Sequence, residues 1–177
     1  MVAAKQSPMK QIVIGILVVV IIAAAGVLYH RLASQTMGAD RVAQQITCVN
    51  NLKELGVTFK IWEGDHNDQF PFNLGTNAGG SREFCRPDAD GFDRNASVFI
   101  RLVSKDGDLT TPRLLVCPQD PSRHPATNWD SLTEDNITYR FRCGTNVSDA
   151  NPQEIFAVCP VDGNTLYCDG TVKTGRQ

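Results

Sequence analysis

The N-terminal part of the chain carries an unbroken run of hydrophobic positions. All 18 residues from 12 to 29 are apolar, glycine or tyrosine, and none has a charged or amide side chain. A helix of this length spans about 27 Å, close to the ~30 Å hydrocarbon core of a bilayer. A cleaved secretory signal is the alternative, but the apolar core of a signal rarely exceeds about 15 residues. The pattern therefore predicts one transmembrane helix over residues 12–29, preceded by a short cytoplasmic segment, residues 1–11.

The residues after this run keep a helical period. Apolar side chains recur at steps of three and four, which places them along one side of a helix, with polar residues such as Asn50 on the other. This apolar stripe consists of Val42, Ile46, Val49, Leu52, Leu55, Phe59 and Trp62. Because no proline interrupts residues 9–63, we expect one long helix whose outer part, residues 30–63, ends at Gly64. The stripe is too apolar to face water, so we expect the rest of the chain to cover it.

The middle of the chain has little periodicity. Residues 64–95 are rich in glycine, asparagine and aspartate, which indicates loops, held in place by Cys85. The next segment has apolar residues at i, i+1, i+4 and i+5. This pattern predicts a short helix over residues 96–106, capped by Asp93 or Asn95, with a strand as the alternative.

Strand signals dominate residues 114–173. The predicted strands are residues 114–117, 137–143, 154–159, 165–168 and 171–173. Pro118 ends the first of them because proline cannot donate to a sheet ladder. Asp169 and Gly170 supply a two-residue hairpin turn before the last. The pattern therefore predicts an α+β fold, in which a long N-terminal helix packs on a small C-terminal antiparallel sheet.

Charged and sulfur-containing residues indicate how the chain is oriented. Lys5 and Lys10 precede the apolar run, which favours a cytoplasmic N-terminus. The cysteines all follow the run and are Cys48, Cys85, Cys117, Cys143, Cys159 and Cys168. Six cysteines within residues 30–177 suit an oxidising compartment, so we expect disulfides, with buried free thiols as the alternative. A zinc site is the weakest explanation, because there is no Cys-x-x-Cys motif and the three histidines show no ligand spacing.

The remaining composition argues against two classes of function. The formal net charge is −2 and the basic residues do not cluster, so we expect no nucleic-acid partner. No Ser-His-Asp, Cys-His or paired-carboxylate arrangement has supporting context. We therefore expect a protein that is not an enzyme, and we assign no catalytic, cofactor-binding or metal-binding residue.

Three blocks of sequence resemble one known family. They are CVNNLKELGVTFKIWEGDHNDQFP (residues 48–71), LLVCPQD (residues 114–120) and GNTLYCDGTV (residues 163–172). In this order they resemble pilin-like, prepilin-type proteins related to the major pseudopilin of the type II secretion system. The resemblance implies a pilin-like structural protein of a type II secretion or type IV pilus-like system. It further implies a single-pass anchor in the bacterial inner membrane, a periplasmic C-terminal domain, and like subunits or other secretion components as partners. We expect the transmembrane helix and the apolar stripe from Val42 to Trp62 to pack against those partners.

The chain departs from this family at the start of its apolar run. Residues 9–15 lack the Gly-Phe-type processing site and the acidic residue that prepilins carry there, so we expect a permanent bitopic anchor. If the helix lies on the sheet, Cys48 and Cys117 meet, and a disulfide between them would join the two layers. Cys159 and Cys168, at opposite ends of one hairpin, are the second candidate pair.

Three alternatives stay open. The first is a stand-alone, membrane-anchored periplasmic module that binds a ligand with loops 73–95 and 119–136. The second is a periplasmic enzyme with an unrecognised site. The third concerns calcium, which related secretion pseudopilins bind in a C-terminal loop. Asp149, Asp162 and Asp169 do not align with those ligands, so calcium has no assigned residues.

Overall fold

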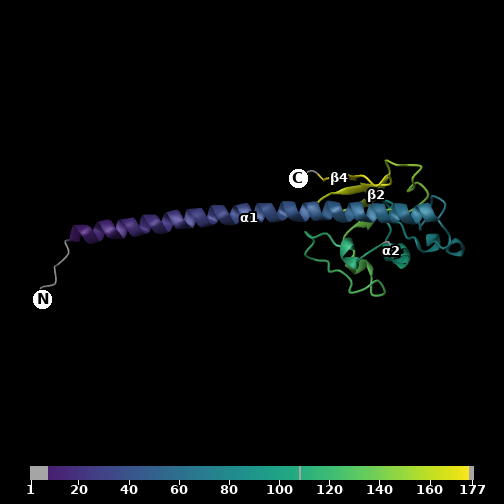
Figure 1. Ribbon diagram of the computed structural model, residues 1–177, viewed down its shortest axis with the longest axis horizontal. Helices are drawn as coiled ribbons and strands as arrows, with labels where there is room; N and C mark the ends of the chain where they lie inside the picture. Colours follow the sequence, from purple (N-terminus) through teal and green to yellow (C-terminus); the bar gives the residue numbers. More distant parts are fainter. Residues whose placement is uncertain (1–7, 108, 176–177) are drawn as a thin grey trace. The chain divides into compact units, whose positions relative to one another are not determined.

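The computed structural model describes residues 8–107 and 109–175. Its helices and strands are α1 (Pro8–Asp65), α2 (Ala96–Lys105), β1 (Arg140–Phe141), β2 (Ile155–Val158), β3 (Thr165–Tyr167) and β4 (Val172–Lys173). Short 3-10 helices occupy Thr76–Ala78, Arg82–Phe84, Pro112–Leu115 and Glu134–Asn136. The chain divides into two compact units, Met1–Val42 and Ala43–Gln177, which we call the anchor unit and the head and describe separately. The N-terminal helix and the small antiparallel sheet confirm the α+β class (Figure 1).

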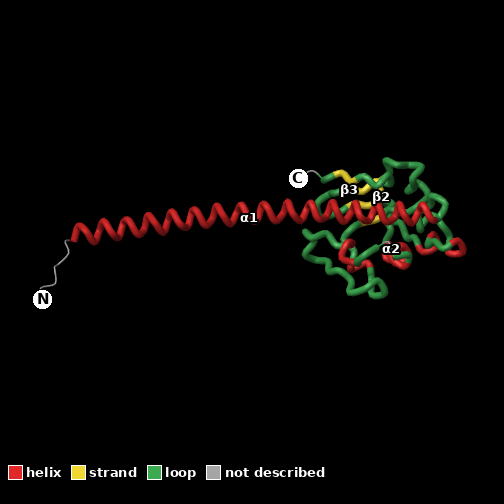
Figure 2. The backbone as a smooth tube through the Cα atoms, viewed as in Figure 1, coloured by secondary structure: helices red, strands yellow, loops and turns green. Residues whose placement is uncertain are grey.

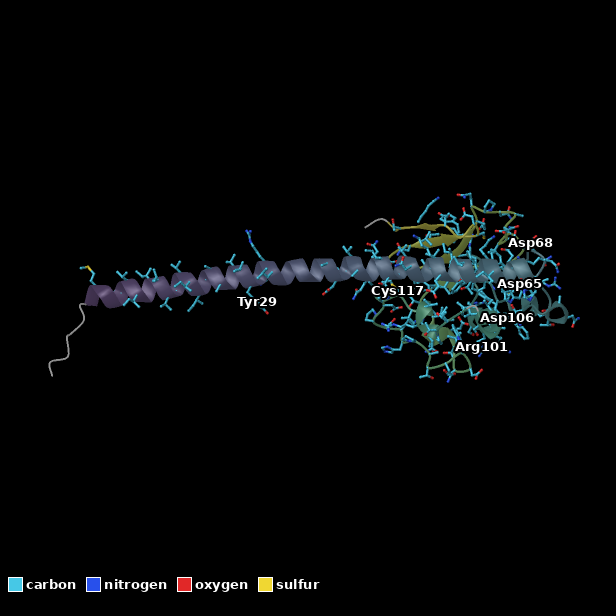
Figure 3. The ribbon with its side chains drawn as sticks, viewed as in Figure 1. Tyr29, Asp65, Asp68, Arg101, Asp106 and Cys117 are labelled. Carbon is cyan, nitrogen blue, oxygen red and sulfur yellow. The ribbon has the colours of Figure 1, made fainter. Side chains whose placement is uncertain are left out.

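The anchor unit contains one helical segment long and apolar enough to cross a membrane. This segment covers Ile12–Leu32, 21 residues with a mean hydropathy of 3.0. Its side chains, Tyr29 among them, are exposed along the whole segment (Figure 3). The predicted span, residues 12–29, lies inside this segment. Helix α1 continues as one helix to Asp65, as the lack of proline predicted.

The core of the head forms around the last five turns of α1. Four residues of the predicted stripe, Leu52, Leu55, Phe59 and Trp62, are fully buried there. The ring of Phe59 lies at the centre, with its centroid 4.9 to 6.4 Å from four other rings. These rings belong to Phe70 in the loop after α1, Phe99 in α2, Phe141 in β1 and Phe156 in β2. Strands therefore cover one side of the helix and α2 another, as Figure 1 also shows.

The beginning of the predicted stripe is not covered. Val42 and Ile46 are exposed, with 51% and 57% of their surface accessible, and Val49 is half-buried. The prediction that the chain covers the whole stripe is therefore wrong for its first two members. The reason is that burial begins only at Cys48, where Tyr139 reaches the helix and its hydroxyl donates to the cysteine sulfur.

The sheet is an antiparallel meander of short strands in the order β1-β2-β3-β4 (Figure 2). In the pairing of β2 with β3, Ile155 lies opposite Tyr167 and Ala157 lies opposite Leu166, so Phe156 is an extra residue in a bulge. A bulge breaks the alternation of side chains between the two faces. Both Phe156 and Ala157 are consequently buried, and the Phe156 ring enters the aromatic core.

The hairpin between β3 and β4 lies directly against α1. A Cβ placed on Gly56 would come within 2.9 Å of Leu166 Cδ1 and 3.4 Å of Gly170 Cα. Gly170 has a φ of +80° and its N–H donates to the Tyr167 carbonyl over 3.0 Å, which confirms the predicted turn. The loop is one residue longer than predicted, because the Tyr167 N–H bonds the Thr171 carbonyl and leaves three residues between them.

The predicted strand over residues 114–117 is wrong. Its first residues belong to the 3-10 helix Pro112–Leu115, which proline begins and the Thr111 hydroxyl caps by accepting the Arg113 N–H. A short apolar run does not distinguish a strand from a buried helical turn, which explains the error. Of the strand predicted over residues 137–143, Arg140–Phe141 forms β1, and Arg142 makes an isolated antiparallel bridge with Phe92. The strands predicted after residue 154 and the short helix over 96–106 are confirmed.

Candidate functional site

Three of the six cysteines converge in the head. Cys48 lies on α1, Cys117 follows the 3-10 helix Pro112–Leu115, and Cys159 follows β2. Their sulfur atoms and a carboxylate oxygen of Asp162 all lie within 4.8 Å of one another, and we call these four residues the three-cysteine cluster. The cysteines are buried and Asp162 is half-buried. Figure 3 places Cys117 beside the helix.

A hydrogen-bond network fixes the side of the cluster that faces α1. The Tyr139 hydroxyl donates to Cys48 Sγ over 3.6 Å. The side-chain amide of Asn51 donates to both the Tyr139 hydroxyl and the Val116 carbonyl, at 3.4 and 3.3 Å. The Cys117 N–H donates to Thr138 Oγ1 over 3.2 Å. The network therefore positions Cys48 and Cys117 from both the helix and the segment before β1.

A tight turn between β2 and β3 fixes the other side. The Cys159 N–H donates to the Asn164 carbonyl, and the Gly163 N–H donates to the Cys159 carbonyl, at 2.8 and 2.9 Å. Gly163 has a φ of +74°, a conformation that favours glycine. The turn brings Asp162 over the sulfur of Cys117, with Oδ2 at 3.9 Å, while Oδ1 accepts the Asn164 N–H at 3.1 Å.

The close approach of these groups perturbs their acidity. Hydrogen bonds from the Cys117 and Cys159 thiols lower the pKa of Cys48, because they stabilise its thiolate. Hydrogen bonding to Cys117 and Cys48 raises the pKa of Cys159, and burial raises the pKa of Asp162. Without a cation, these four groups therefore resist carrying several negative charges at once. Three sulfurs and one carboxylate can bind a soft divalent metal, or two of the sulfurs can form a disulfide.

A second group consists of Cys85, Cys143 and Asp93. Their ligand atoms also lie within 4.8 Å of one another. Asp93 Oδ1 accepts the N–H groups of Arg86 and Asn95 at 2.7 and 3.1 Å. This group joins the loop of residues 64–95 to the segment after β1, as expected of Cys85. With two sulfurs side by side, it is a candidate for one disulfide.

The structure separates one of the two predicted disulfide pairs. Cys48 and Cys117 lie together, but the sulfur of Cys159 is also within 4.8 Å of each of theirs. The Cys159 N–H bonds Asn164 and the Cys168 N–H bonds the Glu154 carbonyl, so Cys159 and Cys168 lie at opposite ends of the β2–β3 pair. A strand of four residues is about 13 Å long, and disulfides need Cα atoms within about 7 Å. The Cys159–Cys168 pairing is therefore wrong. All six cysteines are thiols in this structure, so the other pairings stay predictions.

The residues predicted for subunit association divide into two groups. Leu52, Leu55, Phe59 and Trp62 are buried in the head and have no surface left for another subunit. Val42 and Ile46 of the predicted set are exposed. On the head, Val57 and Ile61 are exposed as well, although they do not belong to that set. Val57 and Ile61 are one helical turn apart and face away from the core. Their i, i+4 spacing was visible in the sequence, but the stronger stripe concealed it.

The three aspartates weighed for calcium do not gather at one site. Asp149 pairs with Lys60, Asp162 belongs to the three-cysteine cluster, and Asp169 Oδ1 accepts the Thr171 N–H and hydroxyl. The sequence pattern did not place Asp162 beside the cysteines, because the chain has no Cys-x-x-Cys motif. The available signal was Cys159-x-x-Asp162, the same spacing with a carboxylate in place of the second thiolate.

Comparisons with protein-family models, curated proteins and solved structures gave no match to this chain. The proposals below therefore rest on the sequence patterns and on the geometry described above.

Proposed function

We propose that this chain is a membrane-anchored, pseudopilin-like structural protein that acts by subunit association. Its partners would be like subunits or other components of a type II secretion or type IV pilus-like system. One observation carries the proposal. Helix α1 contains both an exposed apolar segment, Ile12–Leu32, and a last part whose buried side packs on a four-stranded antiparallel meander. The three sequence blocks that resemble prepilin-type proteins support the same conclusion.

The apolar segment has features that suit helix association in lipid. Gly15 and Gly26 lie on its surface, and no described atom is within 4 Å of a Cβ built on either, apart from the helix itself. Ala23, Ala24 and Ala25 add further small side chains. Small residues let helix backbones approach closely, and close packing is a main source of helix association in a bilayer.

The head offers a second surface for association. Val57 and Ile61 are 58% and 49% exposed on the side of α1 that turns away from the core. About half of each side chain is already covered, so burying the remainder against another subunit would contribute about 1 kcal/mol per side chain. The lysines before the span and the cysteines after it support an inner-membrane anchor with a periplasmic head.

Photo-crosslinking in intact membranes tests the proposal. A photoreactive residue is introduced in place of Val20 in the apolar segment, Val57 on the exposed helix side, or Val161 in the β2–β3 turn. Val161 is the matched control, because it is an exposed valine at 43% but lies off the helix. We expect ladders of dimers and larger species from Val20 and Val57, and monomer from Val161. Monomer from all three positions would contradict subunit association.

A stand-alone ligand-binding module is the second candidate, and one feature favours it. A groove of about 510 Å³ is lined by Asp93 and Arg94 from one predicted binding loop. Asp120, Arg123 and Glu134 line it from the other. Monomers in the crosslinking experiment would leave this groove as the site to examine, and charge reversal at Arg123 would then weaken binding of an anionic ligand.

A further inference from the structure

The four donor atoms of the three-cysteine cluster lie close enough together to surround one metal ion. In a tetrahedral site zinc–sulfur bonds of about 2.3 Å place neighbouring ligand atoms about 3.8 Å apart. The ligand atoms of Cys48, Cys117, Cys159 and Asp162 all lie within 4.8 Å of one another. Cys117 Sγ and Asp162 Oδ2 are 3.9 Å apart. We propose that these four residues bind one zinc ion, which joins α1 to the β2–β3 turn and to the segment before β1.

The composition of the cluster favours a cation over a disulfide. A disulfide consumes two of the three sulfurs and leaves the third packed against the Asp162 carboxylate, two groups that repel each other once both are charged. A divalent cation uses all four donors and neutralises their charge. Thiolate and carboxylate are both zinc ligands, and a closed site with four protein donors is typical of structural zinc.

Groups around the donor atoms hold them in position. The Tyr139 hydroxyl donates to Cys48 Sγ, and the Asn164 N–H holds the second oxygen of Asp162. The Asn164 side chain is completely buried, and its Nδ2 has no hydrogen-bond partner within the described part of the chain. A buried donor of this kind is costly unless an acceptor is nearby. Thiolate ligands of a metal are strong acceptors, and such outer contacts orient metal ligands.

The second group of cysteines provides an internal contrast. Cys85, Cys143 and Asp93 supply three donors rather than four. Two sulfurs and one carboxylate do not complete a tetrahedral shell of protein ligands. We therefore assign zinc to the three-cysteine cluster and not to this one.

Metal analysis of the full-length protein tests the assignment. The protein is extracted from membranes and purified without chelator or reductant, and its zinc is measured by mass spectrometry. We expect about one zinc per chain in the wild type. Asp162→Asn and Cys159→Ser should each lower the zinc content at least tenfold. Cys168→Ser is the matched control, because Cys168 is also a buried cysteine but lies outside the cluster. It should keep its zinc.

Two further measurements remain informative if the ligand variants fail to fold. The wild type is denatured with a chelator, alkylated without reduction and mapped by peptide mass. Alkylation of all of Cys48, Cys117 and Cys159 supports the zinc site, whereas a disulfide between any two of them overturns it. Tyr139→Phe keeps all four ligands and should weaken zinc affinity about 10–100-fold. Zinc-free wild type, or full zinc retention by Asp162→Asn and Cys159→Ser, would also overturn the proposal.

Discussion

Substitution of Phe59 is the most sensitive test of how the head packs, because its ring lies at the centre of the core. It is fully buried and contacts rings from α2, β1, β2 and the loop after α1. The substitution Phe59→Ala removes the whole ring and leaves a cavity between these elements. Because several neighbouring rings also pack on one another, the surrounding core cannot easily close the space.

The expected loss of stability in Phe59→Ala follows from the size of the buried ring. Phenylalanine-to-alanine changes in cores cost about 3–5 kcal/mol, and poor collapse of the cavity favours the upper end of that range. The free energy of unfolding of an ordinary domain is about 5–15 kcal/mol in total. With a urea dependence of about 2 kcal/mol per molar, the midpoint of unfolding should fall by about 2 M.

Urea unfolding of the detergent-solubilised full-length protein measures this loss. Trp62 is buried in the same core, so its fluorescence reports unfolding of the head. Val57→Ala is the control, because Val57 is exposed two positions away on the same helix. Its midpoint should change by less than about 0.3 M, since surface changes are usually within ±0.5 kcal/mol. A midpoint for Phe59→Ala within 0.5 M of wild type, by the same estimate, would refute the proposed packing.

Two other measurements test the helix–hairpin contact and the hairpin turn. Gly56→Ala should destabilise the head by about 1 kcal/mol, because overpacking against Leu166 costs about 1–3 kcal/mol and exceeds the gain in helix propensity. Gly64→Ala meets no described atom within 4 Å and should stabilise by up to about 1 kcal/mol; equal stability of the two variants in urea would contradict the contact. Hydrogen bonds from the Thr171 hydroxyl and N–H lower the pKa of Asp169 in the folded head. The ionised carboxylate therefore stabilises the fold above about pH 4, and this stabilisation is lost as the pH falls through the folded pKa. Asp169→Asn should therefore flatten the acid side of the stability profile, and an unchanged profile would argue against this turn.

Elements that depend on local periodicity could be predicted from the sequence. The apolar run over residues 12–29 and the stripe from Leu52 to Trp62 each repeat with the period of a helix. The alternation and turn residues after residue 154 likewise predicted the β2–β4 meander. These features are local, because each depends on residues within one or two turns of a helix or one hairpin.

Where the stripe ends and where strands form could not be predicted in this way. Val42 and Ile46 continue the period of the stripe but are exposed, because the head reaches the helix only from Cys48 onward. Residues 114–117 have the composition of a strand but follow a capped proline, which starts a 3-10 turn instead. In both cases the outcome depends on which other segment packs there.

The cysteine clusters show most clearly what tertiary structure alone decided. The number of cysteines and their position after the apolar run were in the sequence, and they indicated sulfur chemistry in the head. Cys117 and Asp162 are 45 positions apart and Tyr139 is 91 positions from Cys48, and no local pattern relates them. They meet because the sheet and its turns pack on the apolar side of α1. Burial of apolar surface thus determined which polar and sulfur groups became neighbours.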